Sequence, residues 1–235
     1  MNSEETEIAN EINKQFAAGV RKWMDSEQEK RSKEHLHVSS FVYSCVRKVW
    51  YETKYYDLVP PPDLEGTYRM WIGTKLHETP ITDTHELPLF VESNDMKFGG
   101  RLDEIVEYNG KKIIVDKKFV SHIPSSPNDH YMNQIMFYAA LLKMMKGVIV
   151  DGVALHYFVP HVRYERDLRE FTFVRLVSKD EIEAIEALID EMMKKLKISL
   201  EQNVLPEKHV SWYCKYCPFK VSCDMESLDY LNGEN

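Results

Sequence analysis

The stretch GGRLDEIVEYNGKKIIVDKK, from Gly99 to Lys118, carries most of what the sequence says about the fold. Two runs rich in β-branched and apolar residues flank Asn109-Gly110, and both of these residues tolerate the positive φ of a type I′ turn. We therefore expect a β-hairpin. With these two loop residues Asp103 falls directly opposite Asp116, and directly opposed residues project from the same face of a sheet with β-carbons roughly 5 Å apart.

The hairpin thus brings two carboxylates side by side, and such like charges destabilise a sheet unless a cation lies between them. Oxygen-rich sites of this kind suit Mg²⁺ or Mn²⁺. Lys118 projects to the same face as Asp116, whereas Lys117 projects to the other. These groups suit phosphodiester hydrolysis, because a bound metal polarises a phosphoryl oxygen and lowers the pKa of bound water. Taken alone, two surface acids with a neutralising lysine explain the residues equally well, and a bulge at Gly99-Gly100 would change the register.

Helical and strand-like segments surround the hairpin. The first helix is predicted by an apolar stripe at four-residue spacing, made of Ile8, Ile12, Phe16, Val20 and Met24. Further helices are expected over residues 40–56, 64–78, 129–146 and 178–202, and further strands over residues 87–93, 150–160 and 169–177. This mixture of helices and strands predicts an α/β chain with one main core.

Composition and charge narrow the class of protein. The chain has 235 residues, of which 43% are hydrophobic and 29% charged, as expected for a globular domain with one core or a core and a small lobe. Its formal charge of -8 excludes a uniformly basic surface for nucleic acid but permits a local basic groove. The sequence lacks an apolar run of roughly 18 residues, which a membrane span needs. Its acidic start is unlike a secretory signal. We therefore expect a cytoplasmic protein.

The hairpin pattern, G-x-x-D, strand, D-x-K, resembles that of the PD-(D/E)xK nucleases, and specifically their RecB-like branch. Upstream, GTKLHE at residues 73–78 is similar to the helix that supplies a metal-binding histidine, which maps onto His77. Downstream, DHYMNQIMFYAALL at residues 129–142 resembles the Q-x-x-x-Y helix, which maps onto Gln134 and Tyr138. The resemblance implies a restriction-endonuclease-like fold of the α/β (α+β) class, with a mixed sheet flanked by helices.

The same resemblance implies roles for the site residues. Mg²⁺ or Mn²⁺ would be held by His77, Asp103, Asp116 and the backbone carbonyl of Lys117. Lys118 would position the hydrolytic water. Gln134 and Tyr138 would either contact the substrate or buttress the hairpin.

The cysteines suggest a second metal centre. Cys214, Cys217 and Cys223 form a C-x2-C-x5-C pattern near the end of the chain, and Cys45 stands alone near the start. A C-x2-C pair puts two thiolates within reach of one metal, and four thiolates complete a shell. Disulfides are not expected in a cytoplasmic protein. The spacing alone leaves zinc and an iron-sulfur cluster open.

A further resemblance bears on that choice. The segment SFVYSCVRKVWY, residues 40–51, resembles the entrance segment of RecB-like nucleases whose first cysteine joins three C-terminal ones to hold a 4Fe-4S cluster. The CRISPR-associated exonucleases of the fourth type (Cas-four) have this layout. The resemblance implies a structural cluster on Cys45, Cys214, Cys217 and Cys223. Arg47 and Lys48, beside Cys45, are then candidates for a DNA-binding surface, with Tyr51, Trp212 and Tyr213 as stacking partners.

The function implied is that of a metal-dependent DNA nuclease, an exonuclease on single-stranded DNA or DNA ends. Its role would be CRISPR spacer acquisition, beside an integrase, or DNA recombination and repair. The alternative is a non-catalytic DNA-end-binding or assembly module with a structural metal cluster. Three parts are expected: an N-terminal helical segment (1–62), a nuclease core (63–203) and a cysteine-rich tail (204–235). The oligomeric state stays open.

Overall fold

The computed structural model describes residues 12, 14–15, 18–24, 26, 35–55, 63–78, 80, 82–159 and 169–225. The chain divides into two compact units, the first made of residues 1–33 and 61–79 and the second of residues 34–60 and 80–235. The predicted boundaries at residues 62 and 203 do not coincide with this division. The segment that carries Cys45 and the cysteine-rich tail both belong to the second unit, together with the hairpin of residues 99–118.

The first unit is helical where it is described. Residues 18–24 are helical, and Val20 and Met24 are buried as the apolar stripe predicts, whereas Ile12 is exposed. The stripe residues Ile8 and Phe16 lie outside the described residues. Helix α4 (Leu64–His77) begins after Asp63, whose carboxylate accepts a hydrogen bond from the Gly66 N–H at 2.7 Å and so satisfies one of the free donors of the first turn.

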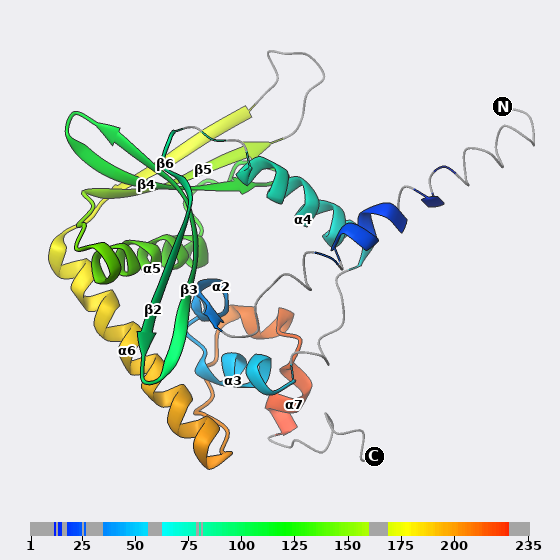
Figure 1. Ribbon diagram of the computed structural model, residues 1–235. Helices are drawn as coiled ribbons and strands as arrows, with labels where there is room; N and C mark the ends of the chain where they lie inside the picture. The colour runs from blue at the N-terminus through cyan, green and yellow to red at the C-terminus, as the bar shows by residue number, and fades with distance from the viewer. Residues whose placement is uncertain are drawn as a thin grey trace, which may run out of the picture. The chain divides into compact units, whose positions relative to one another are not determined.

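The second unit is built on a six-stranded mixed sheet (Figure 1). Its strands are β1 (Leu36–His37), β2 (His85–Ser93), β3 (Met96–Tyr108), β4 (Lys111–Phe119), β5 (Gly152–Val159) and β6 (Arg169–Leu176). The strand order is β1-β3-β4-β5-β6, and β2 pairs with the first part of β3. The pairs β1·β3 and β4·β5 are parallel and the others antiparallel. The predicted mixed sheet is therefore confirmed.

The register of the central hairpin is as expected. Strands β3 and β4 pair from Tyr108↔Lys111 to Glu104↔Val115, and the loop residues Asn109 and Gly110 have φ of 50° and 75°. The bulge considered at Gly99-Gly100 is not formed, because β2 and β3 stay in continuous register from Leu87↔Leu102 to Ser93↔Met96.

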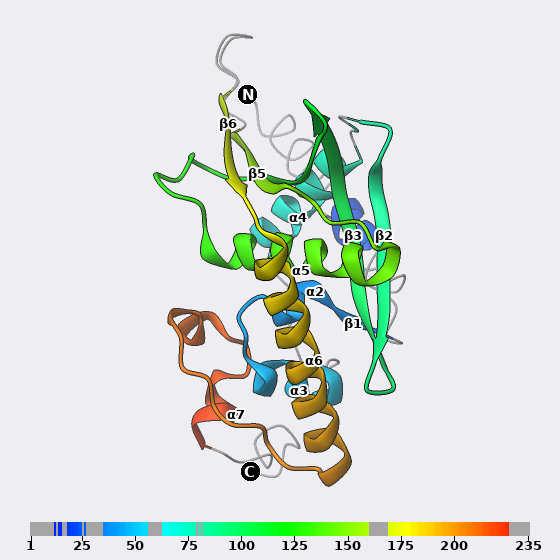
Figure 2. The same cartoon turned by 90° about the vertical axis from the view of Figure 1, so that its left-hand side faces the viewer.

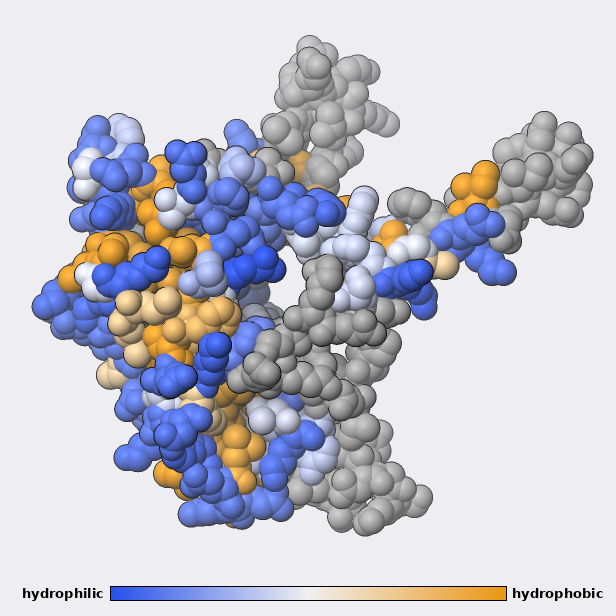
Figure 3. Space-filling view, viewed as in Figure 1, coloured by the Kyte–Doolittle hydropathy of each residue, from blue (hydrophilic) through white to orange (hydrophobic). Residues whose placement is uncertain are grey.

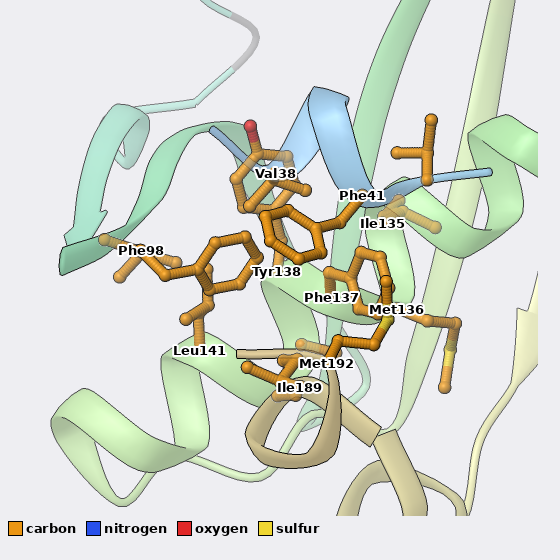
Figure 4. Close-up of a cluster of buried hydrophobic side chains, with 14 of the residues drawn as sticks. Val38, Phe41, Phe98, Ile135, Met136, Phe137, Tyr138, Leu141, Ile189 and Met192 are labelled. Atoms are coloured by element: carbon orange, nitrogen blue, oxygen red, sulfur yellow. The ribbon is translucent and has the colours of Figure 1, made fainter. Parts of the chain in front are cut away.

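Helices α5 (Asp129–Lys146) and α6 (Lys179–Gln202) provide the core (Figures 2 and 4). Asn128 caps the start of α5, and Gly147 ends it in the left-handed conformation with φ of 66°. Ser178 and Glu181 form the expected capping box at the start of α6. Helix α5 packs on the sheet and on α6. The apolar cluster between them contains Phe98, Ile135, Phe137, Leu141, Ile189 and Met192.

The helix predicted over residues 40–56 is instead two helices, α2 (Val38–Phe41) and α3 (Val46–Tyr55). The chain leaves α2 through a turn in which Ser44 takes a positive φ of 52°. A side chain with a Cβ disfavours that conformation inside a helix, so the helix breaks there. The break places Cys45 directly before α3, at a loop position rather than on a helix face.

None of the helices in the described part of the chain is long and apolar enough to cross a bilayer. Apolar side chains do reach the surface of the second unit in the region of β2, α5 and α6 (Figure 3). Met144 and Met145, in the last turn of α5, are among them. The expected cytoplasmic location stays a prediction.

An ion pair lies on the face of the hairpin opposite to Asp116. Lys117 Nζ is 3.0 Å from Glu104 Oε1, and both side chains are fully buried. The second carboxylate oxygen of Glu104 accepts a hydrogen bond from the Thr82 hydroxyl at 2.9 Å. Removing one partner of such a pair leaves an uncompensated buried charge, which costs about 3–5 kcal/mol.

We expect Lys117→Met to lower the thermal-unfolding midpoint by roughly 10 °C, since 1 kcal/mol corresponds to about 2–4 °C in a chain of this size. The double variant Glu104→Leu/Lys117→Met should recover a large part of the loss, because neither charge remains buried. Lys111→Met, at an exposed position of the same strand, is the control. The role assigned to the pair would be refuted by equal midpoints for Lys117→Met and the control, measured by circular dichroism under argon.

Candidate active site

The hairpin brings the predicted carboxylates together. Asp103 and Asp116 are 7% and 2% exposed. Asp103 Oδ2 accepts a hydrogen bond from the Lys117 backbone N–H at 2.8 Å, which ties the Asp103 side chain to strand β4, and both carboxylates act on Lys118. Lys118 Nζ lies 2.8 Å from Asp116 Oδ2 and 3.0 Å from Oδ1. The three groups that the sequence placed on one face are therefore in one site.

The charge of Lys118 is set by these neighbours. Burial of the ammonium favours the neutral amine, but the carboxylates of Asp116 and Asp103 favour the charged form and outweigh it. The pKa of Lys118 is raised as a result. Lys118 is therefore an ammonium at neutral pH, able to donate hydrogen bonds and to attract a phosphate.

Helix α5 supplies Gln134 and Tyr138 to the same site. Gln134 Oε1 accepts a hydrogen bond from Lys118 Nζ at 3.3 Å, and Gln134 is also hydrogen-bonded to Tyr138. Burial, followed by the charge of Asp116, raises the pKa of the buried Tyr138 hydroxyl. A Cβ on Gly100 would lie only 2.7 Å from this hydroxyl, so the tyrosine reaches the site because residue 100 is a glycine. The two predicted residues thus hold Lys118 in place.

A third carboxylate, missed by sequence reasoning, lies next to Asp103. Asn94 and Asp95, both with positive φ, turn β2 into β3, and the register they set places Glu86 across from Asp103. Glu86 has φ of 48° and interrupts the ladder between His85 and Leu87. A carboxylate oxygen of Glu86 lies within 4.8 Å of one of Asp103. Counting residue pairs outward from the Asn94-Asp95 turn would have predicted that Glu86 lies opposite Asp103.

The group of carboxylates fits a hard divalent cation. Oxygen ligands in a partly buried site are the donors that Mg²⁺ and Mn²⁺ prefer. Arg101 balances Glu86 through a 2.9 Å ion pair, and Lys118 balances Asp116. The predicted ligand His77 is the last residue of α4, in the first unit. The ligand roles of His77 and of the Lys117 carbonyl stay predictions.

The four cysteines meet at a second location. Cys45 is remote in sequence from the other three. All four carry free thiols and are partly buried. Cys45 before α3, Cys214 in the 3₁₀ turn η3 (Trp212–Tyr216), Cys217 after it and Cys223 in α7 (Lys220–Met225) line one pocket. Both cartoon views place α3 beside α7 (Figures 1 and 2).

The structure corrects the role predicted for Arg47 and Lys48. They are only 7% and 6% exposed and line the cysteine pocket, so they do not form a surface for DNA. Arg47 Nε donates to the Pro206 carbonyl at 2.6 Å, and its Nη1 lies 3.8 Å from Cys223 Sγ. Lys48 pairs with Glu52 at 2.6 Å. The partner of Lys48 lies one helical turn away, whereas the partners of Arg47 are distant in sequence and no local pattern reveals them.

The predicted stacking residues differ in accessibility. Tyr51 is fully buried and stacks on Phe219, so it is a core residue. Tyr213 stacks on Tyr43 with ring centroids 3.6 Å apart. Trp212 is 54% exposed. Of the three, only Trp212 presents most of its ring to solvent.

Comparison with known proteins gives the family of the chain. Residues 4–224 match the PD-(D/E)XK nuclease superfamily. The chain belongs to this superfamily. Its D-x-K strand, with Asp116 and Lys118, and the opposing Asp103 are the residues that the structure brings together in the site. Nucleases of this superfamily use divalent metal ions, which agrees with the carboxylates described above.

Two individual proteins extend the comparison. The chain is 28% identical over 204 residues to the CRISPR-associated exonuclease Cas4 of Saccharolobus solfataricus, covering 80% of this chain and 86% of the relative. A crystal structure of the protein SSO0001 superposes with a TM-score of 0.58 at 20% identity, covering 92% of this chain and 98% of the other. The second comparison supports the restriction-endonuclease-like fold.

We expect Gly100→Ala to reduce nuclease turnover about tenfold, as is typical when a supporting residue of a metal site is displaced. The new methyl group would push the Tyr138 hydroxyl away from Gln134 and so loosen Lys118. In a Tyr138→Phe background, which removes the clashing oxygen, the same substitution should have little further effect. Additive losses in the double variant, measured as initial rates on a labelled strand, would contradict this arrangement.

Proposed function

We propose that the protein is a metal-dependent deoxyribonuclease that acts as an exonuclease on single-stranded DNA or single-stranded DNA ends. The observation that carries the proposal is the Asp103–Asp116–Lys118 arrangement, in which two buried carboxylates and an ammonium share one face of the hairpin. A non-catalytic DNA-binding module does not need buried like charges, which destabilise the sheet that holds them.

The site residues have different proposed roles in hydrolysis. Asp103 and Asp116 are proposed as ligands of Mg²⁺ or Mn²⁺, together with His77 and the Lys117 carbonyl, which the sequence predicts. A divalent ion at this place would polarise the scissile phosphate and lower the pKa of bound water. Lys118 donates hydrogen bonds that orient the attacking water and the phosphate. Gln134 and Tyr138 keep the Lys118 ammonium next to Asp116.

The similarity to a relative supports a proposal for the biological setting. The similarity to a CRISPR-associated exonuclease over most of both chains supports a role in trimming DNA fragments before they are stored as spacers, beside an integrase. A stand-alone role in recombination or repair uses the same site residues.

We further propose that Cys45, Cys214, Cys217 and Cys223 hold a 4Fe-4S cluster. Four free thiols from opposite ends of the chain line one pocket. Burial raises the pKa of Cys217, and the backbone hydrogen bond with Phe219 and the charge of Lys48 oppose that rise only in part. Arg47 Nη1 lies 3.8 Å from Cys223 Sγ. Arg47 and Lys48 thus place positive charge in the pocket, which would offset part of the negative charge of four iron-bound thiolates. The cluster ties the two chain ends together and needs no redox step.

Asp116→Ala and Lys118→Ala should each reduce Mn²⁺-dependent cleavage of an end-labelled single strand by roughly 10²-fold or more, since they remove a metal ligand and the group that orients the water. Glu107→Ala and Lys111→Ala, exposed positions of the same hairpin, are the matched controls and should cleave normally. Visible absorbance should be the same in all four variants. Full activity in Asp116→Ala would remove the assignment.

A preparation made without oxygen should contain about four iron atoms per chain and absorb visible light, as a 4Fe-4S protein does. Cys45→Ser and Cys214→Ser should lose this colour to the same extent, although the two residues lie at opposite ends of the chain. Iron retained in Cys45→Ser would contradict the four-cysteine site. If the wild-type protein contained one zinc ion per chain and no iron, the cluster assignment would be wrong and the four cysteines would form a zinc site.

A further inference from the structure

A row of aromatic rings runs from the catalytic lysine to the cysteine-rich segment. Lys118 Nζ lies 4.8 Å from the ring centroid of Tyr131. The rings of Tyr131 and His130 are 4.0 Å apart between centroids, and those of His130 and Trp212 are 5.8 Å apart. Tyr216 follows Trp212 at 6.1 Å. Two segments far apart in sequence, α5 and η3, therefore form one continuous aromatic surface.

The outer end of this row is open to solvent. Trp212 is 54% and Tyr216 63% exposed, although both are large rings that proteins generally bury at least in part. Tyr131 and His130 are partly buried and connect the exposed rings to Lys118. An exposed row of this kind that leads into an active site indicates a ligand-binding surface.

The exposed rings are held by a rigid support. Tyr213, between Trp212 and Cys214, stacks face to face on Tyr43 with an interplanar angle of 11°. The Ser211 N–H lies 3.4 Å from Cys214 Sγ, which fixes the start of the same turn. Trp212 is therefore presented by a turn with a defined backbone. A ring held in this way loses little conformational freedom when a flat partner stacks on it.

The row is uncharged apart from its ends. Burial lowers the pKa of His130 to about 4, and the neighbouring Lys118 lowers it in the same direction, so the imidazole is neutral at physiological pH. The row begins at the Lys118 ammonium, and at its outer end Lys215 Nζ lies 4.8 Å from the Tyr216 ring. Neutral faces between two cations match a strand of stacked bases with a negatively charged backbone.

We propose that this row, Tyr131, His130, Trp212 and Tyr216, binds the unpaired bases of the substrate strand and leads its end toward Lys118. The inference rests on the proposed nuclease function and assigns the residues that would bind the substrate strand next to that site. Base faces are available for stacking in a single strand, whereas in a duplex they are covered by neighbouring base pairs. The row therefore selects single-stranded nucleic acid, independently of sequence.

Trp212→Ala should weaken binding of a fluorescein-labelled oligothymidylate about tenfold, as expected for the loss of one base–aromatic stack. Binding is measured by fluorescence anisotropy with the cluster-loaded protein in the absence of divalent ions, so that no cleavage occurs. Trp212→Phe should restore most of the affinity. Tyr108→Ala, which removes an exposed ring at the tip of the β3–β4 hairpin, should bind like the wild type.

Two further ligands separate stacking from charge. An abasic strand of equal length and a fully paired duplex should bind the wild type and Trp212→Ala equally, because they offer no free base faces. Equal affinity of both proteins for oligothymidylate, or an equal loss on the abasic strand, would overturn the proposal. If Trp212→Ala loses visible absorbance, Tyr216→Ala takes its place with the same expected result. Failure of the nuclease proposal is recognised separately, as absence of cleavage by the wild type with Mn²⁺.

Discussion

The pairing of β3 with β4 is the constraint on which the site depends. It holds Asp103 and Asp116 on one face. Two unit charges at the spacing of about 5 Å that is typical of opposed β-carbons repel by roughly 3 kcal/mol at an effective dielectric constant of about 20. The backbone ladder from Glu104↔Val115 to Tyr108↔Lys111 resists this repulsion, and Lys118 screens it. The hairpin therefore keeps two charges together that would separate in a flexible loop.

Both faces of the hairpin carry carboxylates and a lysine, but only one face forms the candidate active site. On one face Asp103, Asp116 and Lys118 reach the site, while on the other Glu104 and Lys117 form a closed pair. Each site carboxylate has a neighbour in sequence that belongs to the closed pair, so a shift in register by one residue would exchange the faces. A buried ion pair contributes little net stability, but a shifted register would separate Lys117 from Glu104 and leave both charges buried without a partner, which would disfavour that register.

The features that were predicted correctly from the sequence are those that short-range rules determine. The alternation of a strand and the Asn109-Gly110 turn are local, and they were sufficient to set the register that runs to Glu104↔Val115, directly beside Asp103 and Asp116. The prediction for Arg47 was wrong because its partners, Pro206 and Cys223, are distant in sequence and no local pattern indicates them. Glu86 was missed for a different reason. Its position followed from a turn that could have been counted in the same way.

The cysteine pocket and the aromatic row share one short segment. Cys214 and Trp212 lie on the same 3₁₀ turn, and Tyr213 between them anchors that turn to Tyr43, just before Cys45. A cluster bound by Cys45 and Cys214 would therefore fix the distance between the two parts of the chain that support Trp212. In this arrangement the cluster would take no part in the chemistry, yet it would determine how Trp212 is presented to a substrate strand. A structural cluster at this place would thus serve the proposed hydrolytic site without a redox step.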